Sequence, residues 1–145
     1  MSPSKCLQNG FTMIELIVVI VILAILGAMA LPKFVDLRSD ALQSSASGVA
    51  AQLSEAMSVN YSGCEAHAHA VTANKCQAVS NCSDGLNLLA GGALPTTGNT
   101  TYSITAAALG SGAPGANGVT GACTLTATSG ATNLTTTFRG MSAGL

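Results

Sequence analysis

The feature that most constrains this chain is a run of sixteen uncharged residues, Leu16–Leu31, rich in Ile, Val, Leu and Ala. Counted from Phe11, the apolar block has twenty-one residues, and as an α-helix it would measure about 31 Å, the thickness of one bilayer core. A cleaved secretory signal has a shorter apolar core followed by small residues, whereas this block continues into further helical sequence. The sequence therefore predicts a membrane-length N-terminal helix, for which a plain single-pass anchor is the simplest interpretation.

One carboxylate, Glu15, lies just inside the apolar block. A charged side chain at the bilayer centre costs about 3 kcal/mol on insertion scales, so it normally has a partner. Cleavage between Gly10 and Phe11 would create an α-amino group on Phe11, one helical turn before Glu15. In a bundle of parallel helices staggered by about one turn, Glu15 of one subunit would neutralise the Phe11 amine of its neighbour. Such a pair would set the register of the bundle, as a single polar residue does in a coiled coil.

The heptapeptide Gly10–Leu16, GFTMIEL, followed by the apolar run and Pro32, resembles the cleavage-and-assembly motif of type IV pilins and their relatives. The resemblance covers about the first fifty residues, and Pro32–Ala41 is most similar to pilins of the mannose-sensitive haemagglutinin (MSHA) type. It implies cleavage after Gly10 by a prepilin peptidase, N-methylation of Phe11, an assembly role for Glu15 and a filament with a helical core. The leader departs from the family pattern, because it has a single Lys and no basic residue beside Gly10.

The same resemblance implies the partners and the location of the protein. The partners would be identical subunits in a helical homopolymer, the prepilin peptidase, an inner-membrane assembly platform with its ATPase, and an outer-membrane secretin. The precursor would lie in the inner membrane, and the assembled subunit in an extracellular pilus that supports surface attachment or biofilm formation.

Two residues interrupt the helical pattern of the apolar block. Gly27 is a poor helix former, and Pro32 lacks the amide hydrogen and clashes with the carbonyl of Ala28. In filaments of the resembled family, the segment before this proline can extend. A static kink and an extensible segment are both open interpretations of Gly27 and Pro32.

Beyond Pro32 the pattern becomes amphipathic and then alternating, which predicts an α+β fold. Apolar residues at helical spacing form one face, and Ser62-Gly63 provides a helix stop, so one helix is expected over about residues 11–60. Further on, two alternating segments flank the turn Ser129–Thr132 and predict a hairpin, with a third strand near residues 102–106. The helical face comprises Val35, Leu42, Ala46, Val49, Leu53 and Met57; the strand faces comprise Cys123, Leu125 and Ala127, and Leu134, Thr136 and Phe138.

The expected architecture is a long N-terminal α-helix, apolar and then amphipathic, packed on a small antiparallel β-sheet head that disulfides staple. Its predicted parts are a leader at residues 1–10, which is removed, a helix at 11–62 that serves as membrane anchor and filament core, and a globular β head at 63–145.

The cysteines predict two disulfides in the head. If Cys6 belongs to a removed leader, four cysteines remain, and they allow three connectivities. Oxidised pairs indicate a periplasmic or extracellular destination. We prefer Cys64 with Cys76, which ties the helix end to the next loop, and Cys82 with Cys123, whose loop of about forty residues is worth about 3–4 kcal/mol in the chain-entropy model.

Other chemistry is not indicated by the sequence. No cofactor site, metal site, catalytic constellation or nucleic-acid surface is expected, because the chain is nearly neutral and has only 3% aromatic residues. His67 and His69 have metal-ligand character, yet they are the only two histidines, and exposed loop residues are the favoured interpretation.

Three alternatives to a major pilin remain. A pseudopilin of type II secretion shares the N-terminal motif, although major pseudopilins resemble one another in an acidic calcium site and Asp84 is the only acid after Glu65 here. A minor pilin at the filament tip would have the same N-terminal motif. A monomeric, membrane-anchored binding domain would need neither Glu15 nor the Gly10-Phe11 junction.

Overall fold

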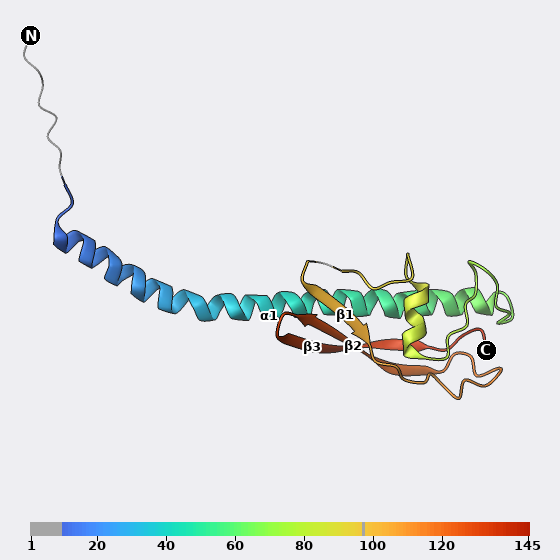
Figure 1. The fold of residues 1–145 in the computed structure, drawn as a ribbon. Helices are drawn as coiled ribbons and strands as arrows, with labels where there is room; N and C mark the ends of the chain where they lie inside the picture. The colour runs from blue at the N-terminus through green and yellow to red at the C-terminus, as the bar shows by residue number, and fades with distance from the viewer. Residues whose placement is uncertain (1–9, 97) are drawn as a thin grey trace, which may run out of the picture. The chain divides into compact units, whose positions relative to one another are not determined.

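The computed structural model describes residues 10–96 and 98–145, with the backbone alone for residues 31–36. Its elements are helix α1 (Met13–Glu65), the 3-10 helix η1 (Cys82–Leu88), and strands β1 (Thr100–Ile104), β2 (Thr120–Ser129) and β3 (Thr132–Met141) (Figure 1). The chain divides after Arg38 into two compact units. The first contains the apolar part of α1, and the second contains the amphipathic part of α1 together with the sheet. The predicted α+β class is confirmed.

The core of the second unit lies between the amphipathic part of α1 and one face of the sheet. Leu53 and Met57 of α1 are fully buried, as are Cys123 and Leu125 of β2, and Phe138 of β3 joins the same cluster. The predicted helical and strand faces are therefore the buried ones. Val35, the first residue predicted for the helical face, lies outside the side chains that the structure describes.

The sheet is antiparallel with strand order β1-β2-β3. The predicted hairpin is present: Ser129 pairs with Thr132, and Gly130 and Ala131 form the turn between them. Gly130 has a φ of +61°, as expected at the first central position of a type II′ turn, whose twist matches that of the flanking strands. β1 ends at Ile104, two residues before the predicted end of the third strand, although the Thr105 amide still donates to the Thr124 carbonyl at 3.0 Å.

Helix α1 continues to Glu65, past the predicted stop at Ser62-Gly63. A Cβ at Gly63 would collide with the backbone carbonyl of Lys75, so glycine allows the next loop to lie against the helix. One turn earlier, the buried Asn60 side chain makes two hydrogen bonds of 2.9 Å with the backbone of Gln77. The glycine that suggests a helix end thus serves the packing of a loop.

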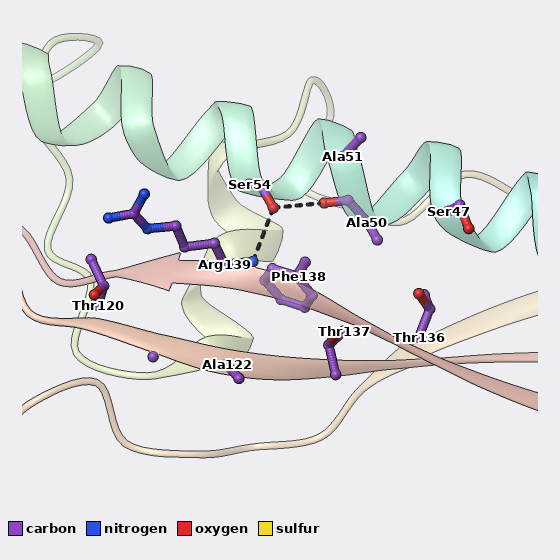
Figure 2. Close-up of a pocket in the computed structure, with 11 residues that line it drawn as sticks. Ser47, Ala50, Ala51, Ser54, Thr120, Ala122, Thr136, Thr137, Phe138 and Arg139 are labelled. Atoms are coloured by element: carbon purple, nitrogen blue, oxygen red, sulfur yellow. Dashed lines mark hydrogen bonds between the residues drawn. The ribbon is translucent and has the colours of Figure 1, made fainter.

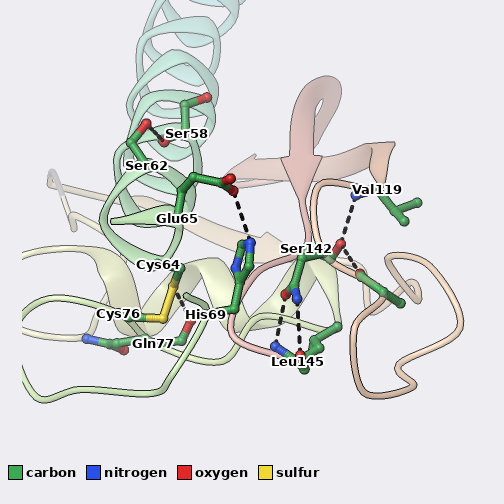
Figure 3. A network of polar contacts seen from close by, with 12 residues as sticks. Ser58, Ser62, Cys64, Glu65, His69, Cys76, Gln77, Val119, Ser142 and Leu145 are labelled. Carbon is green, nitrogen blue, oxygen red and sulfur yellow. Dashed lines mark hydrogen bonds and ion pairs between the residues drawn. A yellow bond between two sulfur atoms is a disulfide. The ribbon is translucent and has the colours of Figure 1, made fainter. Parts of the chain in front are cut away.

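Both disulfides are present in the preferred pairing. Cys64 at the end of α1 is bonded to Cys76, and Cys82 at the start of η1 is bonded to Cys123 in the middle of β2. All four cysteines are fully buried. The first bond ties the end of the helix to the loop that follows it, as Figure 3 shows, and the second ties η1 to the sheet.

Gly140 and Gly48 provide a matched test of this packing. A methyl group at Gly140 would lie 2.5 Å from Sγ of Cys123 and 2.7 Å from Cδ2 of Leu109, whereas one at Gly48 in α1 would meet nothing within 4 Å. We expect Gly140→Ala to lower the free energy of unfolding by about 1–3 kcal/mol, as overpacking does. Gly48→Ala should raise it by up to about 1 kcal/mol, because Ala favours the helix. Denaturant unfolding of the full chain in detergent, followed by circular dichroism, measures both; equal effects would contradict the packing described.

Candidate assembly and processing site

The N-terminal part of α1 presents a continuous apolar surface. The window Met13–Ala30 has a mean hydropathy of 2.9, and none of it is buried by the part of the chain that the structure describes. Between Phe11 and Met29, the large apolar side chains range in exposure from 48% at Ile17 to 91% at Phe11. By length and composition, this helix is able to cross a membrane.

The start of α1 is closed by reciprocal hydrogen bonds between Thr12 and Glu15. The backbone amide and the hydroxyl of Thr12 each donate to Oε2 of Glu15 at 2.8 Å, and the Glu15 amide donates to the Thr12 hydroxyl at 3.4 Å. This arrangement is a capping box, which satisfies backbone amides that have no partner inside the helix. Our sequence reasoning missed it, although the spacing Thr-x-x-Glu before an apolar run is its usual pattern.

The capping box folds the Glu15 carboxylate back toward the N-terminal end of the helix. Gly10 and Phe11 immediately precede the helix, and both are exposed. Phe11, Ile14, Val18 and Val19 line a shallow hollow with Glu15. The peptide bond between Gly10 and Phe11 is thus accessible, and a carboxylate lies one helical turn beyond it. Cleavage there, methylation of Phe11 and the assembly role of Glu15 stay predictions.

The two predicted weak points of the helix lie inside α1. The backbone of α1 is helical without interruption at Gly27 and Pro32. Whether this segment extends under load stays a prediction. Of the predicted leader, Gly10 alone is among the described residues, and Cys6 lies outside them.

The two histidines lie where α1 ends. Nε2 of His69 is 3.0 Å from Oε2 of Glu65 (Figure 3). The centroid of the His69 ring lies 5.6 Å from that of the Tyr61 ring. His67 is partly buried and is the second residue after the end of α1. Among the described residues, no group of three His, Cys, Asp or Glu side chains is placed to hold a metal ion. Through these contacts His69 packs against the C-terminal end of α1.

Asp84, the only acid after Glu65, belongs to the cap of η1. Its Oδ2 accepts hydrogen bonds of 2.8 Å from the backbone amides of Ser80 and Asn81. In return, the Asn81 side chain accepts a hydrogen bond from the Ser83 amide at 3.2 Å. The Asp84 carboxylate is thus occupied by a structural role in the head.

Comparison with known proteins identifies the N-terminal segment. Residues 5–31 match the family described as the prokaryotic N-terminal methylation motif, so the chain carries this motif. A stretch of 51 residues, 35% of the chain, is 47% identical to the type IV narrow pilus major component PilA5 of Thermus thermophilus. The match spans 44% of the length of that relative. No solved structure matches this chain significantly.

The capping box predicts the behaviour of the first turn of α1. Thr12→Val removes the hydroxyl that bonds to Glu15 in both directions, and the loss of such a cap costs about 1 kcal/mol. We expect the Leu16 amide, which donates to the Thr12 carbonyl at 3.3 Å, to exchange with deuterium about fivefold faster. Hydrogen exchange of the full chain in detergent measures this. Thr12→Ser retains the hydroxyl and should exchange as the parent does; identical rates in all three proteins would contradict the capping role.

Proposed function

We propose that this chain is a structural subunit of a type IV pilus filament, made as a prepilin and assembled through its N-terminal helix. The observation that carries the proposal is the methylation motif at residues 5–31, which coincides with an exposed apolar helix bearing a single carboxylate. The similarity to a Thermus pilus component over 51 residues supports the same interpretation. In this proposal, residues 1–10 are the removed leader, 11–62 form the anchor and filament core, and 63–145 form the head.

The apolar part of α1 suits both states of such a subunit. A helix with this hydropathy needs an apolar surrounding on all sides. A bilayer provides it before assembly, and the packed helices of neighbouring subunits provide it in the filament. Because both surroundings are apolar, a subunit moves between them without exposing this surface to water.

Glu15 provides the specificity that apolar packing lacks. In the isolated chain its carboxylate is satisfied by Thr12, within the same helix. After cleavage, the Phe11 α-amine carries a positive charge beside this carboxylate. In a staggered bundle, the carboxylate exchanges its own helix cap for the amine of a neighbouring subunit, and an unpaired charge in an apolar core is strongly unfavourable. Only one register then pairs every charge.

The remaining partners and the location follow from the same proposal. The prepilin peptidase cleaves after Gly10 and methylates Phe11; the assembly platform, its ATPase and the secretin build and export the filament. The subunit lies in the inner membrane first and on the cell surface afterwards. Two disulfides support an oxidising destination for the head. The stretch Pro32–Ala41, which resembles MSHA-type pilins, favours surface attachment or biofilm formation as the role of the filament.

A type II secretion pseudopilin and a minor tip pilin share the N-terminal motif and remain the rivals. The engagement of Asp84 in the cap of η1 gives no support to an acidic calcium site in this head. A minor pilin would be sparse in sheared filaments, whereas a pseudopilin would be absent from them.

Substitution of Glu15 tests the proposal. We expect Glu15→Ala to abolish filaments in the sheared surface fraction, because the register-setting charge is lost, while the protein accumulates in the inner membrane. The control is Glu55→Ala, which removes an exposed carboxylate of α1 in the second unit and should leave filaments at the parental level. Immunoblots of sheared and membrane fractions give both amounts. Filaments of Glu15→Ala at the parental level would refute the assembly role and favour a plain membrane anchor.

A further inference from the structure

The outer edge of β3 has unpaired backbone groups. In antiparallel pairs, successive residues alternate between those that bond to the neighbouring strand and those that point away from it. The Arg139 amide points away from β2, because it donates to Oγ of Ser54 in α1 at 3.0 Å. By the same alternation, the amide and carbonyl groups of Asn133, Thr135 and Thr137 also point away from β2. Within the described part of the chain, no hydrogen bond is made to these outward groups.

This edge lacks the usual protection against further strands. Natural proteins place Lys, Pro or a bulge on an exposed edge, or cover it. Asn133, Thr135 and Thr137 are exposed and uncharged, and the pairing of β3 with β2 is regular from Thr132 to Met141. The edge is therefore a template of about five residues for another strand.

An open groove with a volume of about 660 Å³ adjoins this edge at Thr137 and is lined by α1, by residues 136–139 of β3 and by residues 120–122 of β2 (Figure 2). Its helical wall is formed by the small residues Ser47, Ala50 and Ala51. In the wall of the groove, the Ser54 hydroxyl donates to the Ala50 carbonyl and accepts from the Arg139 amide, each at 3.0 Å. The small side chains of the helical wall leave room beside β3 for the side chains of an added strand.

Arg139 gives the groove its only charge. It is also the only Lys or Arg in the chain after Lys75. Arg139 itself is exposed, and among the described residues no carboxylate lies within ion-pair distance of its guanidinium. The end of the groove near Arg139 is therefore suited to a negative charge supplied from outside.

We propose that this groove binds an extended, acidic segment of a partner protein, which adds to β3 as a fourth strand. Its backbone pairs with Asn133 and Thr135 along the edge and with Thr137 where the edge enters the groove, and its carboxylate lies at Arg139. Alternate side chains of the added strand point to the helical wall at Ser47 and Ala51, where Val or Leu fits, as is usual in recognition by strand addition. The groove lies wholly within the second unit, so the proposal does not depend on filament assembly.

The segments of this chain itself fit the groove less well. A second copy of β3 contains no acid and brings the same Arg139, so it offers no charge to the groove. Residues 1–9 contain Lys5 and no acid. Leu145 is held in its own head, because its amide donates to the Asn117 side chain at 2.9 Å and its carbonyl accepts from that side chain at 3.1 Å. Charge complementarity thus favours a partner protein.

The test is selection from a random heptapeptide library displayed on phage, with the purified full chain in detergent as the target. We expect enriched peptides to alternate β-branched or apolar residues with polar ones and to place Asp or Glu at one end. Synthetic peptides of the enriched sequences are then titrated against variants by fluorescence anisotropy. A random heptapeptide library contains every five-residue sequence that includes an acidic residue. Selection that enriches no such pattern would therefore overturn the proposal.

Two pairs of variants distinguish strand addition from other modes of binding. Thr135→Pro removes an outward amide without breaking the ladder to β2, and we expect binding to weaken at least about tenfold. Thr135→Val retains the amide and should bind as the parent does. Arg139→Gln should weaken binding about fivefold, and Arg139→Glu should reverse the preference toward peptides that end in Lys. The proposal would be overturned if Thr135→Pro bound the peptides as tightly as the parent does, or if the Arg139 variants kept the peptide preference of the parent. It would also be overturned if the chain associated with itself at this edge.

Discussion

The rest of this molecule depends on one constraint, which is that the apolar surface of α1 between Met13 and Ala30 has to be buried by something other than the described chain. A surface of this extent is unfavourable in water and marks an interaction site. Apolar contact has little directional specificity, so it fixes neither register nor partner by itself. Register and partner therefore depend on the few polar atoms at the end of this surface, chiefly the Glu15 carboxylate, which caps the helix with Thr12.

The head shows how a small domain with few large apolar residues holds together at the end of such a helix. The amphipathic part of α1 supplies one side of the core, and β2 supplies the other. The disulfide between Cys82 and Cys123 joins η1 to the central strand, while that between Cys64 and Cys76 secures the loop at the helix end. The outer face of the sheet is rich in Thr and nearly free of charge, which leaves Arg139 as an isolated cation beside an open edge.

Much of this fold could be predicted from the sequence, because burial imposes periods that the sequence displays. The helical spacing of Leu53 and Met57 and the alternation around Leu125 each identify the face that the core buries. The sequence predictions failed where a residue is required for a contact with another segment of the chain. Gly63 suggests a helix end, yet it allows the Lys75 carbonyl to approach a helix that continues.

Other features depend on tertiary contacts or on strand pairing, and no local periodicity of the sequence indicates them. The helix η1 depends on a cap in which Asp84 and Asn81 bond reciprocally, within a stretch of mixed polar residues. The open groove depends on where Arg139 of β3 lies relative to Ser54 of α1, which only the assembled head defines. At the N-terminus, by contrast, the spacing of Thr12 and Glu15 indicates a capping box, whereas the sequence prediction paired Glu15 with a Phe11 amine and not with Thr12.

The measurement that tests the central claim most directly is the intact mass and N-terminal sequence of protein sheared from the cell surface. The account predicts a chain that begins at Phe11 and differs from the reduced, unmodified chain in two ways. It is heavier by one CH2 group, because a methyl group replaces a hydrogen, and lighter by four hydrogens, because two disulfides are closed. This single result would establish processing, methylation and export together. Absence of the protein from the sheared fraction, with uncut or periplasmic protein in the cells, would contradict the account.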